Sequence, residues 1–584
     1  MNKKILNVMC LALCATSVLG TTACGGGKVS YDTTKTQLFV QTYDGGYGSE
    51  WLERVGDRFE TAFADYKLGD KVGVEIVPIL NTELGSGVDN NWITNTNEIF
   101  FLEQTTYHKM YEKGRFLEIT DIMTEKLTQY GESGSIVDKM NPTLVEYYNE
   151  GTEENPKYYA LNYSNSYEAF MYDEDLFYQQ GFYYTKLRDE NKSAPTADCL
   201  ISPETKKAAD GDYAHLETVK GTTYWKTTEG EYLSHGPDGK YGTQDDGQPA
   251  TYDEFFALLD YIKDESGGVT PIIVAGKANT GYFAWLFQQL VADYEGETAM
   301  RRNLEFEGVA DNLIEVDANG NVTPLPTITL DDSNRLQQYK SAGRYYALKF
   351  MEKLFENGGQ KYMNTRSFAG SVDQIRAQEY FVYSVKDDEK YALSFDGCWW
   401  ETEASDTLDT MAENFGSQYA KENRRFRTMS LPKATEEKVG EQSTFYENHF
   451  FCAFIRSDIG EKADLAKKFL QFCFTDESNS EFTAYTGVTR PFDYEIMDKH
   501  KGEMSYFAKD SVALANNENV NIVYPAPDSQ YYFDNYDMIT GLGLASIHLN
   551  GHDYDSLLEM FYTKKFSAET VFNGIYPRAE RELG

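Results

Sequence analysis

Alternating apolar and polar residues near the start of the chain predict a β-α-β unit. Residues 37–42 alternate as a strand, and residues 72–76 alternate as a second strand. Between them, Ser49 can cap a helix whose apolar residues recur at helical spacing. The members of this apolar stripe are Trp51, Leu52, Val55, Phe59 and Phe63. Because a β-α-β unit implies a parallel sheet, the pattern predicts an α/β fold.

The loop after the first predicted strand is a candidate ligand contact. Tyr43 and Asp44 follow the strand at 37–42, and a glycine-rich stretch continues to Gly48. In parallel sheets, ligands bind beyond the carboxyl ends of the strands. Glycines allow a ligand to approach the backbone closely. We therefore expect Tyr43 and Asp44 to lie in a ligand site.

Helical patterns return at 252–264, 336–357 and 461–474. Residues 183–250 show neither the helical nor the strand period of apolar residues. This polar stretch has few apolar residues in regular positions. A long segment of this kind is typical of an insertion on the surface of a domain.

Three aspartates in this insertion form a candidate metal site. Asp238, Asp245 and Asp246 lie in one glycine-rich loop. Calcium prefers several oxygen ligands, which these carboxylates could supply. Their spacing is not that of an EF-hand, which needs a glutamate at the twelfth position. The loop is thus predicted either to bind Ca²⁺ or to form a solvated acidic turn.

The N-terminus has the pattern of an export signal. Lys3 and Lys4 precede an apolar run at 5–20 that is too short to span a bilayer. Cys24 follows a small residue and precedes three glycines, which resembles a bacterial lipobox, although Thr21 stands where leucine is usual.

This pattern predicts a lipoprotein signal peptide at 1–23, lipidation of Cys24 and a flexible tether at 24–35. The alternative is an ordinary secretory signal that is cleaved near Ala23. Either signal places the protein outside the cytoplasm.

The length and the net charge of the chain limit the functions that it can have. The chain has 584 residues, a net charge of −39 and 15% aromatic residues, which together indicate several folded domains. The acidity argues against nucleic acid, an anionic membrane surface or a polyanionic substrate, because phosphate contacts need clustered lysine or arginine. The sequence contains no GxxxxGK[ST], GxSxG or HExxH motif. Catalysis therefore has no specific sequence signal.

A cluster at 391–401 is the most informative candidate site. An apolar strand leads into Asp396, and Trp399 and Trp400 follow it as two of only six tryptophans. A sugar ring has an apolar face and a polar rim, so it suits a flat aromatic ring beside carboxylates such as Asp396 and Glu401. Adjacent residues of a strand point to opposite faces, so one of these rings is expected in the core.

Several short motifs follow one another in a characteristic order. They are MYDEDLF at 171–177, TYDEF at 251–255, FDGCWW at 395–400, LP at 431–432, a helix at 463–474 and TGVTRP at 486–491. In this order they resemble the extracellular solute-binding proteins of ABC importers, in particular the carbohydrate-binding group that includes maltose-binding protein. The resemblance covers most of the chain after the signal. In that group, the position of Trp399 carries a sugar-stacking aromatic residue.

The resemblance implies a periplasmic-binding-protein-like fold of two discontinuous α/β lobes with a hinge and a ligand cleft between them. Lobe one would be 36–155 plus 450–488, and lobe two 156–449 plus 489–584, with the insertion at 183–250. The function implied is capture of an oligosaccharide without chemistry and its delivery to the permease subunits of an ABC transporter. The protein would be a monomer on the extracellular face of the cell membrane, attached only through its lipid.

The expected ligand contacts come from loops and crossing segments of both lobes. They are Tyr43, Asp44, Glu103, Asn165, Glu168, Trp285, Asp396, Trp399, Trp400, Glu401, Asn448 and Arg490. We expect no cofactor apart from the candidate Ca²⁺.

Two other functions remain open at this stage. One is a secreted glycoside-active enzyme that uses Asp396 and Glu401 as its carboxylate pair. The other is a surface adhesion or scaffold protein. A receptor releases its sugar intact, which distinguishes it from the enzyme, and closes around its ligand, which distinguishes it from a scaffold.

Overall fold

The computed structural model describes residues 31–43, 45–81, 84–103, 106–180, 182–186, 200–201, 215–219, 222–226, 232–240 and 243–584. The predicted signal peptide, Cys24 and Asp44 lie outside these residues, as does much of the predicted insertion. No helix within the described part of the chain is long and apolar enough to cross a membrane.

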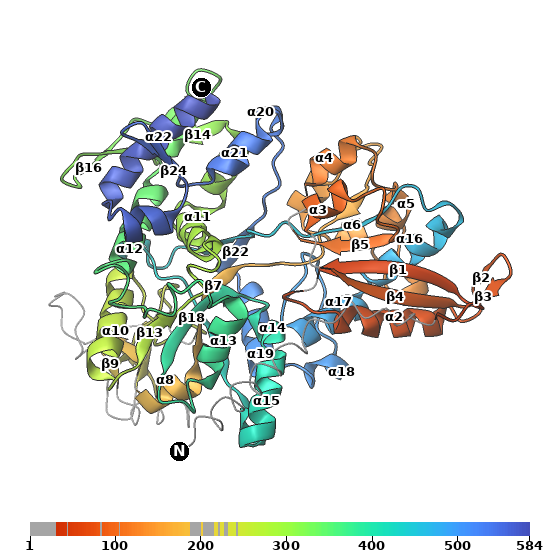
Figure 1. Cartoon of the computed structure of the whole chain (residues 1–584), viewed down its shortest axis with the longest axis horizontal. Coiled ribbons are helices and arrows are strands. Elements are labelled where there is room, and N and C mark those ends of the chain that lie inside the picture. Colours follow the sequence, from red (N-terminus) through yellow and green to blue (C-terminus); the bar gives the residue numbers. More distant parts are fainter. Residues whose placement is uncertain are drawn as a thin grey trace, which may run out of the picture.

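The first sheet confirms the β-α-β prediction. Its strand order is β4 (Val74–Asn81), β1 (Thr36–Tyr43), β5 (Ile99–Leu102), β21 (Cys452–Ile455) and β6 (Ala160–Leu161). β1 runs parallel to β4 and β5, whereas β21 runs antiparallel to β5 and β6. Helix α2 (Glu50–Ala62) covers the sheet with the predicted apolar stripe, of which Trp51, Leu52, Val55 and Phe59 are buried. We call this sheet and its helices lobe one (Figure 1, right).

The second predicted strand begins two residues later than expected. Val72 belongs to the short strand β3 (Lys71–Val72), which pairs with β2 (Lys67–Leu68) in a small hairpin, and it is 47% exposed. Gly73 separates this hairpin from β4 with φ at +88°, a conformation that favours glycine.

The second sheet has the order β13 (Thr270–Ile273), β18 (Tyr391–Gly397), β7 (Glu168–Asp173) and β19 (Phe426–Met429). β13 and β18 are parallel, and β7 is antiparallel to both of its neighbours. All residues of β7 and β18 are buried, which fits central strands covered on both faces. We call this sheet and its helices lobe two (Figure 1, left).

The predicted helices are confirmed within one or two turns of their expected ends. They are α10 (Tyr252–Glu265), α12 (Ala342–Leu354) and α16 (Ala463–Phe472). Thr251 caps α10 by accepting a hydrogen bond from the backbone N–H of Glu254 at 3.3 Å. The long helix α11 (Gly281–Glu305) packs against β7 and β18 and begins near the contact between the lobes.

The predicted insertion contains strands that its polar sequence does not predict. Five of them form a sheet in which every recorded pairing is antiparallel, in the order β10 (His215–Val219), β11 (Thr222–Lys226), β12 (Tyr232–Leu233), β8 (Tyr183–Lys186) and β9 (Leu200–Ile201).

The chain crosses between the lobes in several segments that bond to one another. Residues 162–167 connect β6 to β7, and residues 447–451 connect β20 (Ser443–Tyr446) to β21. The side-chain amide of Asn162 donates to the buried carboxylate of Glu447 at 3.1 Å. Such short, mutually bonded crossings are suited to act as a hinge. The expected boundary after residue 155 precedes β6, which still belongs to the first sheet.

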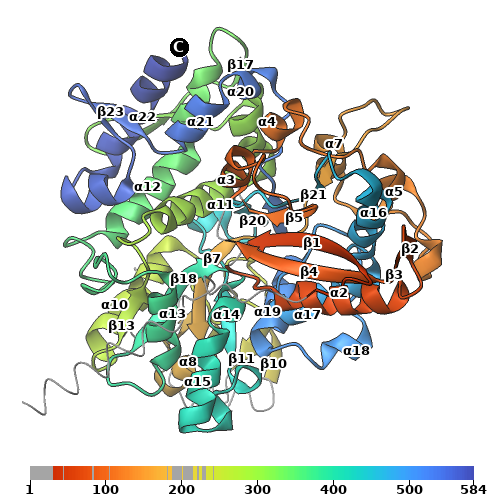
Figure 2. The same ribbon diagram turned by 45° about the vertical axis from the view of Figure 1, so that its right-hand side comes forward.

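The lobes also meet away from the crossing segments. Helix α4 (Tyr107–Glu112) of lobe one contacts α20 (Gln530–Asp534) and α21 (Tyr536–Leu542), which extend from lobe two, and Figures 1 and 2 show the two sets of helices facing each other. The rings of His108 and Phe533 stack with centroids 4.1 Å apart. Lys109 forms a 2.5 Å ion pair with Asp537.

Candidate functional site

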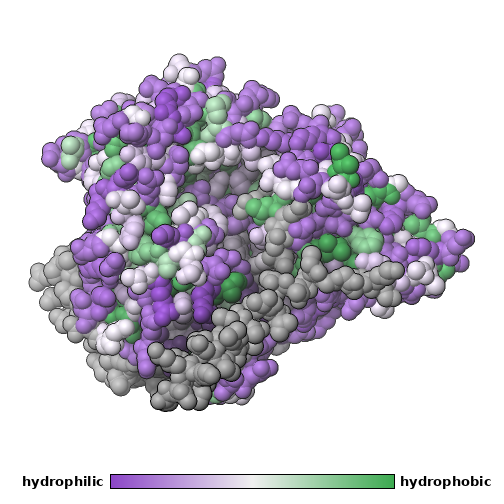
Figure 3. Space-filling model, in the orientation of Figure 1, coloured by the Kyte–Doolittle hydropathy of each residue, from purple (hydrophilic) through white to green (hydrophobic). Residues whose placement is uncertain are grey.

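A cavity of about 640 Å³ lies between the lobes. Its walls come from α4, from α11 and from the C-terminal helices α20 and α21, and a hollow between the lobes is visible on the face shown in Figure 3. The aromatic side chains in its lining are Tyr107, Tyr147, Trp285, Tyr446, Phe450, Tyr532, Phe533 and Tyr536. Polar groups such as Gln288 and Asn448 lie among them. Concave sites with this mixture bind small organic molecules.

Trp285 links this cavity to a second group of predicted residues. It lies in the first turns of α11, lines the cavity and contacts the His449 ring at 4.8 Å between centroids. Trp399 contacts the same imidazole from another side, at 5.0 Å. The two predicted tryptophans are therefore brought together around a histidine that the sequence analysis did not select.

The position of Trp399 is set by glycines of both lobes. Its ring lies over Gly397, where an added Cβ would be only 2.3 Å from the ring. Gly46 of lobe one lies against the same ring, because a Cβ there would be 3.0 Å from Trp399 Cδ1. The ring of Tyr47 meets it edge-on at 6.3 Å. Trp399, 8% exposed, thus lies at the contact between the lobes.

Asp396, which is buried, and Glu403, which is half-buried, form a pair of carboxylates beside this contact. Gln378 donates to both of them through its Nε2, at 3.0 Å to Asp396 and 2.7 Å to Glu403. Tyr282 donates its hydroxyl to Asp396 at 3.1 Å. Burial, and then the charge of Glu403, raises the pKa of Asp396 to about 7. Burial also raises the pKa of Glu403. The geometry thus brings hydrogen-bond acceptors and aromatic rings together.

The predicted residues Glu103, Glu168 and Asn448 surround His449. Its Nδ1 lies 3.6 Å from Glu103, and its Nε2 lies 3.4 Å from Glu168. Asn448 and Gln289 each donate to the other oxygen of Glu168 at 2.6 Å. Glu103 follows β5 of lobe one, whereas Glu168 begins β7 of lobe two. This polar group therefore spans both lobes and one crossing segment.

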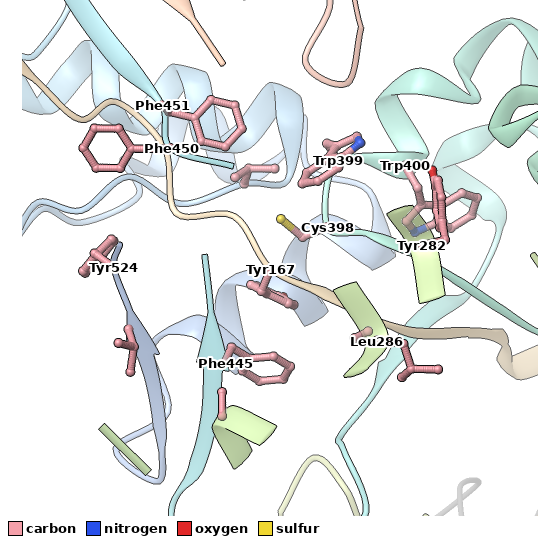
Figure 4. Packing of buried hydrophobic residues seen from close by; sticks show 14 of the residues in the cluster. Tyr167, Tyr282, Leu286, Cys398, Trp399, Trp400, Phe445, Phe450, Phe451 and Tyr524 are labelled. Carbon is pink, nitrogen blue, oxygen red and sulfur yellow. The ribbon is translucent and has the colours of Figure 1, made fainter. Parts of the chain in front are cut away.

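Trp400, Glu401 and Arg490 are buried away from the group around Trp399, against the expectation that each contacts the ligand. Trp400 is the member of the tryptophan pair that lies in the core, where one of the two rings was expected. Trp400 is 1% exposed and packs against Phe381, Phe426 and Phe507 in the core of lobe two. Figure 4 shows its ring pointing away from that of Trp399. The backbone turns into α14 (Trp400–Glu403) at this point, which separates the two rings.

Glu401 and Arg490 are buried in other surroundings. Ser505 donates to Glu401 at 2.5 Å, and burial raises the pKa of Glu401 to about 7. Arg490 donates to the Cys473 carbonyl at 2.6 Å and lies over the Phe482 ring at 4.0 Å. Burial lowers the pKa of Arg490 to about 10. Neither side chain is part of the group around Trp399.

Asn165 is a crossing-segment residue. Its backbone N–H donates to the Thr489 carbonyl at 2.8 Å, and its side-chain oxygen accepts from the Tyr524 hydroxyl at 2.6 Å. These bonds hold three chain segments together. Tyr43 is the last residue of β1 and is half-buried beside Gly45, just ahead of the Gly46 contact with Trp399.

Sequence reasoning missed Tyr47, Tyr282, Gln378, Glu403 and His449. Weak signals exist for three of them. Tyr282 precedes Trp285 by one helical turn, Glu403 follows Trp399 by four residues, and His449 is adjacent to Asn448. Gln378 comes from a different helix, α13 (Gln374–Tyr383), and only the tertiary structure brings it to the site.

The predicted calcium loop is partly described. Asp245 accepts hydrogen bonds from the backbone N–H of Asp238 at 3.0 Å and from the Thr243 hydroxyl at 2.7 Å. Burial and the charge of Asp238 raise the pKa of Asp245 to about 6. Among the residues described, no group of three or more histidine, cysteine or acidic side chains is arranged to hold a metal ion. Ca²⁺ binding by Asp238, Asp245 and Asp246 stays a prediction.

The raised pKa values predict that the protein loses stability as pH rises. A carboxyl with a raised pKa, such as Asp396, holds its proton in the folded state above the pH at which the unfolded chain releases it. His449, whose pKa is also raised, has the same effect on stability. The folded state then binds more protons, so its stability falls with increasing pH. For Asp396 alone, about 1.4 kcal/mol per pKa unit gives a loss of ~2 kcal/mol between pH 5.5 and pH 7.

Urea unfolding at pH 5.5, 7 and 8.5 measures this dependence. Asp396→Asn should make the free energy of unfolding fall less steeply with pH. A wild-type stability that is constant or increases over this range would contradict the assignment.

The fold is that of the two-lobe solute-binding proteins. The solved structure of the solute-binding protein RafE in complex with raffinose is similar, with a TM-score of 0.51, 12% sequence identity, and coverage of 94% of this chain and 100% of that one. This likeness confirms the predicted fold class.

Two further solved structures are similar at lower scores. One is the cyclic α-maltosyl-1,6-maltose binding protein of Arthrobacter globiformis, at TM-score 0.48 and 11% identity, covering 94% of this chain and 99% of that one. The other is an ABC transporter solute-binding protein of Agrobacterium radiobacter K84 in complex with ribitol, at TM-score 0.49 and 11% identity, covering 94% and 98%. No family model matches the sequence, and the comparison with curated proteins finds no match.

Proposed function

We propose that this protein is an extracellular carbohydrate-binding protein that captures an oligosaccharide between its lobes and delivers it to the permease of an ABC importer. The observation that carries the proposal is the cavity between the lobes, with eight aromatic side chains, Trp285 among them, in its wall. Trp285 also contacts the His449 ring, and Trp399 contacts that ring from another side. A sugar offers its apolar face to an aromatic ring and its hydroxyls to carboxylate and amide oxygens.

Under this proposal, Trp285, Trp399 and Tyr282 supply the aromatic surface. Asp396, Glu403, Glu103 and Asn448 supply hydrogen-bond partners for hydroxyls. Tyr43 is proposed to contact the ligand from lobe one, and the same contact by Asp44, which lies outside the described residues, stays a prediction from the sequence. The raffinose bound to the similar RafE structure supports a sugar as the ligand class.

Capture without chemistry is favoured over glycoside cleavage. A glycosidase needs two carboxyl groups that face one scissile bond from either side. Asp396 bonds to Tyr282 and Gln378, whereas Glu401 bonds to Ser505 in a separate buried environment. The two carboxylates of the enzyme hypothesis therefore do not face a shared space.

The remaining parts of the proposal come from the N-terminal sequence and the fold class. We propose that Cys24 carries the lipid that attaches the protein to the outer face of the cell membrane. The closed, liganded protein would act as a monomer and present both lobes to the permease. Metabolic labelling with a palmitate analogue, lost in Cys24→Ser, tests the anchor.

A thermal-shift screen of neutral oligosaccharides tests the ligand class. We expect at least one to stabilise the protein, to be recovered intact and to compact the protein in small-angle X-ray scattering. Binding without compaction would favour a scaffold, and cleavage would favour an enzyme. The absence of a shift across raffinose-, malto- and xylo-oligosaccharides would count against the proposal.

The excess of carboxylates predicts discrimination against acidic sugars. Glu103, Asp396 and Glu403 lie around the proposed ligand position, so a uronate would meet like charges. We expect the uronic-acid analogue of a cognate sugar to bind at least fivefold more weakly at pH 7.5. Isothermal titration calorimetry of the matched pair measures this ratio, and equal affinities would refute the prediction.

A further inference from the structure

His449 occupies a singular position between the lobes. It lies in the crossing segment 447–451 and is 4% exposed. Glu103 approaches it from lobe one and Glu168 from lobe two. His449, in the crossing segment, therefore contacts one carboxylate from each lobe.

The charges around His449 favour its cationic form. Each ring nitrogen faces a different carboxylate, at 3.6 Å and 3.4 Å, and only the imidazolium has an N–H on both nitrogens. Glu447, on the same segment, is bonded by Asn162 and Ser166, and burial raises its pKa well above the usual value. Burial by itself lowers the pKa of His449, but Glu103 and Glu168 outweigh it and raise the pKa to about 10.

The same ring also contacts both tryptophans. Trp285 and Trp399 contact His449 at interplanar angles of 62° and 84°. A cation beside an aromatic ring is attracted to it, and the attraction grows when both are removed from water. A change in the charge or position of His449 would therefore move the proposed sugar-stacking surface.

We propose that His449 is a cationic positioning residue that joins Glu103 of lobe one to Glu168 of lobe two and thereby orients Trp285 and Trp399 for the ligand. This inference rests on the proposed function. Glu103 follows Leu102, which pairs with Cys452 at the start of β21, so its contact with His449 lies at the lobe-one end of the crossing segment. Glu168 meets the same ring at the start of β7, the lobe-two end of the other crossing segment.

Histidine-selective ¹³C and ¹⁵N NMR of the full-length protein tests the charge. We expect the His449 signal, assigned by its loss in His449→Gln, to keep the imidazolium shift from pH 6 to pH 8.5. Glu103→Gln preserves the shape but removes one charge, so it should bring the His449 titration into this range. A His449 signal of neutral imidazole at pH 7 would overturn the inference.

Calorimetry with the tightest neutral oligosaccharide from the screen tests the positioning role. We expect His449→Gln to weaken binding about fivefold at pH 7.5 and to reduce ligand-induced quenching of tryptophan fluorescence. His449→Lys, which restores a cation, should recover part of this loss. Unchanged affinity in His449→Gln would refute the inference.

The failure of a variant to fold, the failure of the proposed function and the failure of this inference can be told apart. If His449→Gln does not fold, Glu103→Gln takes its place, with the same expected direction and the same contradicting result. If the wild-type protein binds no sugar, the proposed function fails and the positioning role fails with it. If the wild-type protein binds sugar while His449 is neutral, only the inference fails.

Discussion

We expect Trp399→Ala to lower the affinity for a cognate oligosaccharide more than tenfold while the protein stays folded. The Trp399 ring lies at the contact between the two lobes, where it touches Gly46, Tyr47 and His449. Burying an aromatic face against a sugar stabilises the complex by ~2–3 kcal/mol through apolar contact. Each 1.4 kcal/mol corresponds to about a tenfold change in affinity.

Trp400→Ala is the matched control, because it removes the same side chain one residue further along. Trp400 is enclosed by the aromatic rings of Phe381, Phe426 and Phe507. Its loss should reduce the free energy of unfolding by ~3–5 kcal/mol, as for other large core residues. Calorimetry and urea unfolding of both variants separate the two roles. If Trp399→Ala keeps wild-type affinity, the stacking role is disproved.

The general fold could be predicted because its signals are local in sequence. The apolar stripe of Trp51, Leu52, Val55 and Phe59 and the strand before it specify one β-α-β unit without reference to the rest of the chain. The antiparallel sheet of the insertion was missed, since polar strands show no apolar alternation.

The site could be predicted only in part, because residue type does not specify burial. Trp399 and Trp400 are adjacent and chemically identical, and the turn from β18 into α14 determines which ring reaches the other lobe. Glu401 directly follows the FDGCWW motif and Arg490 lies within TGVTRP, yet tertiary contacts bury both side chains. Glu403 and His449 acquire their partners from segments far away in the sequence.

Gly46→Ala should weaken oligosaccharide binding about tenfold by keeping the lobes from closing. Its Cβ would lie 3.0 Å from Trp399 Cδ1 and 3.2 Å from Cγ, across the contact between lobe one and lobe two. Trp399 cannot retreat, since its ring already lies over Gly397. The closed state therefore loses stability, whereas the open state is unaffected by this contact. A ligand that binds the closed state then loses affinity by the same free energy.

Gly48→Ala provides a control for the backbone. Both glycines have positive φ, +57° at Gly46 and +64° at Gly48, so each substitution costs about 1 kcal/mol of strain. An added Cβ at Gly48 meets no atom within 4 Å. The two variants should thus show similar losses of thermal stability, but only Gly46→Ala should lose affinity and ligand-induced compaction in small-angle scattering. Equal affinities of Gly46→Ala and Gly48→Ala would mean that the Gly46–Trp399 contact does not limit closure. Backbone strain would then account for all of the stability lost in both variants.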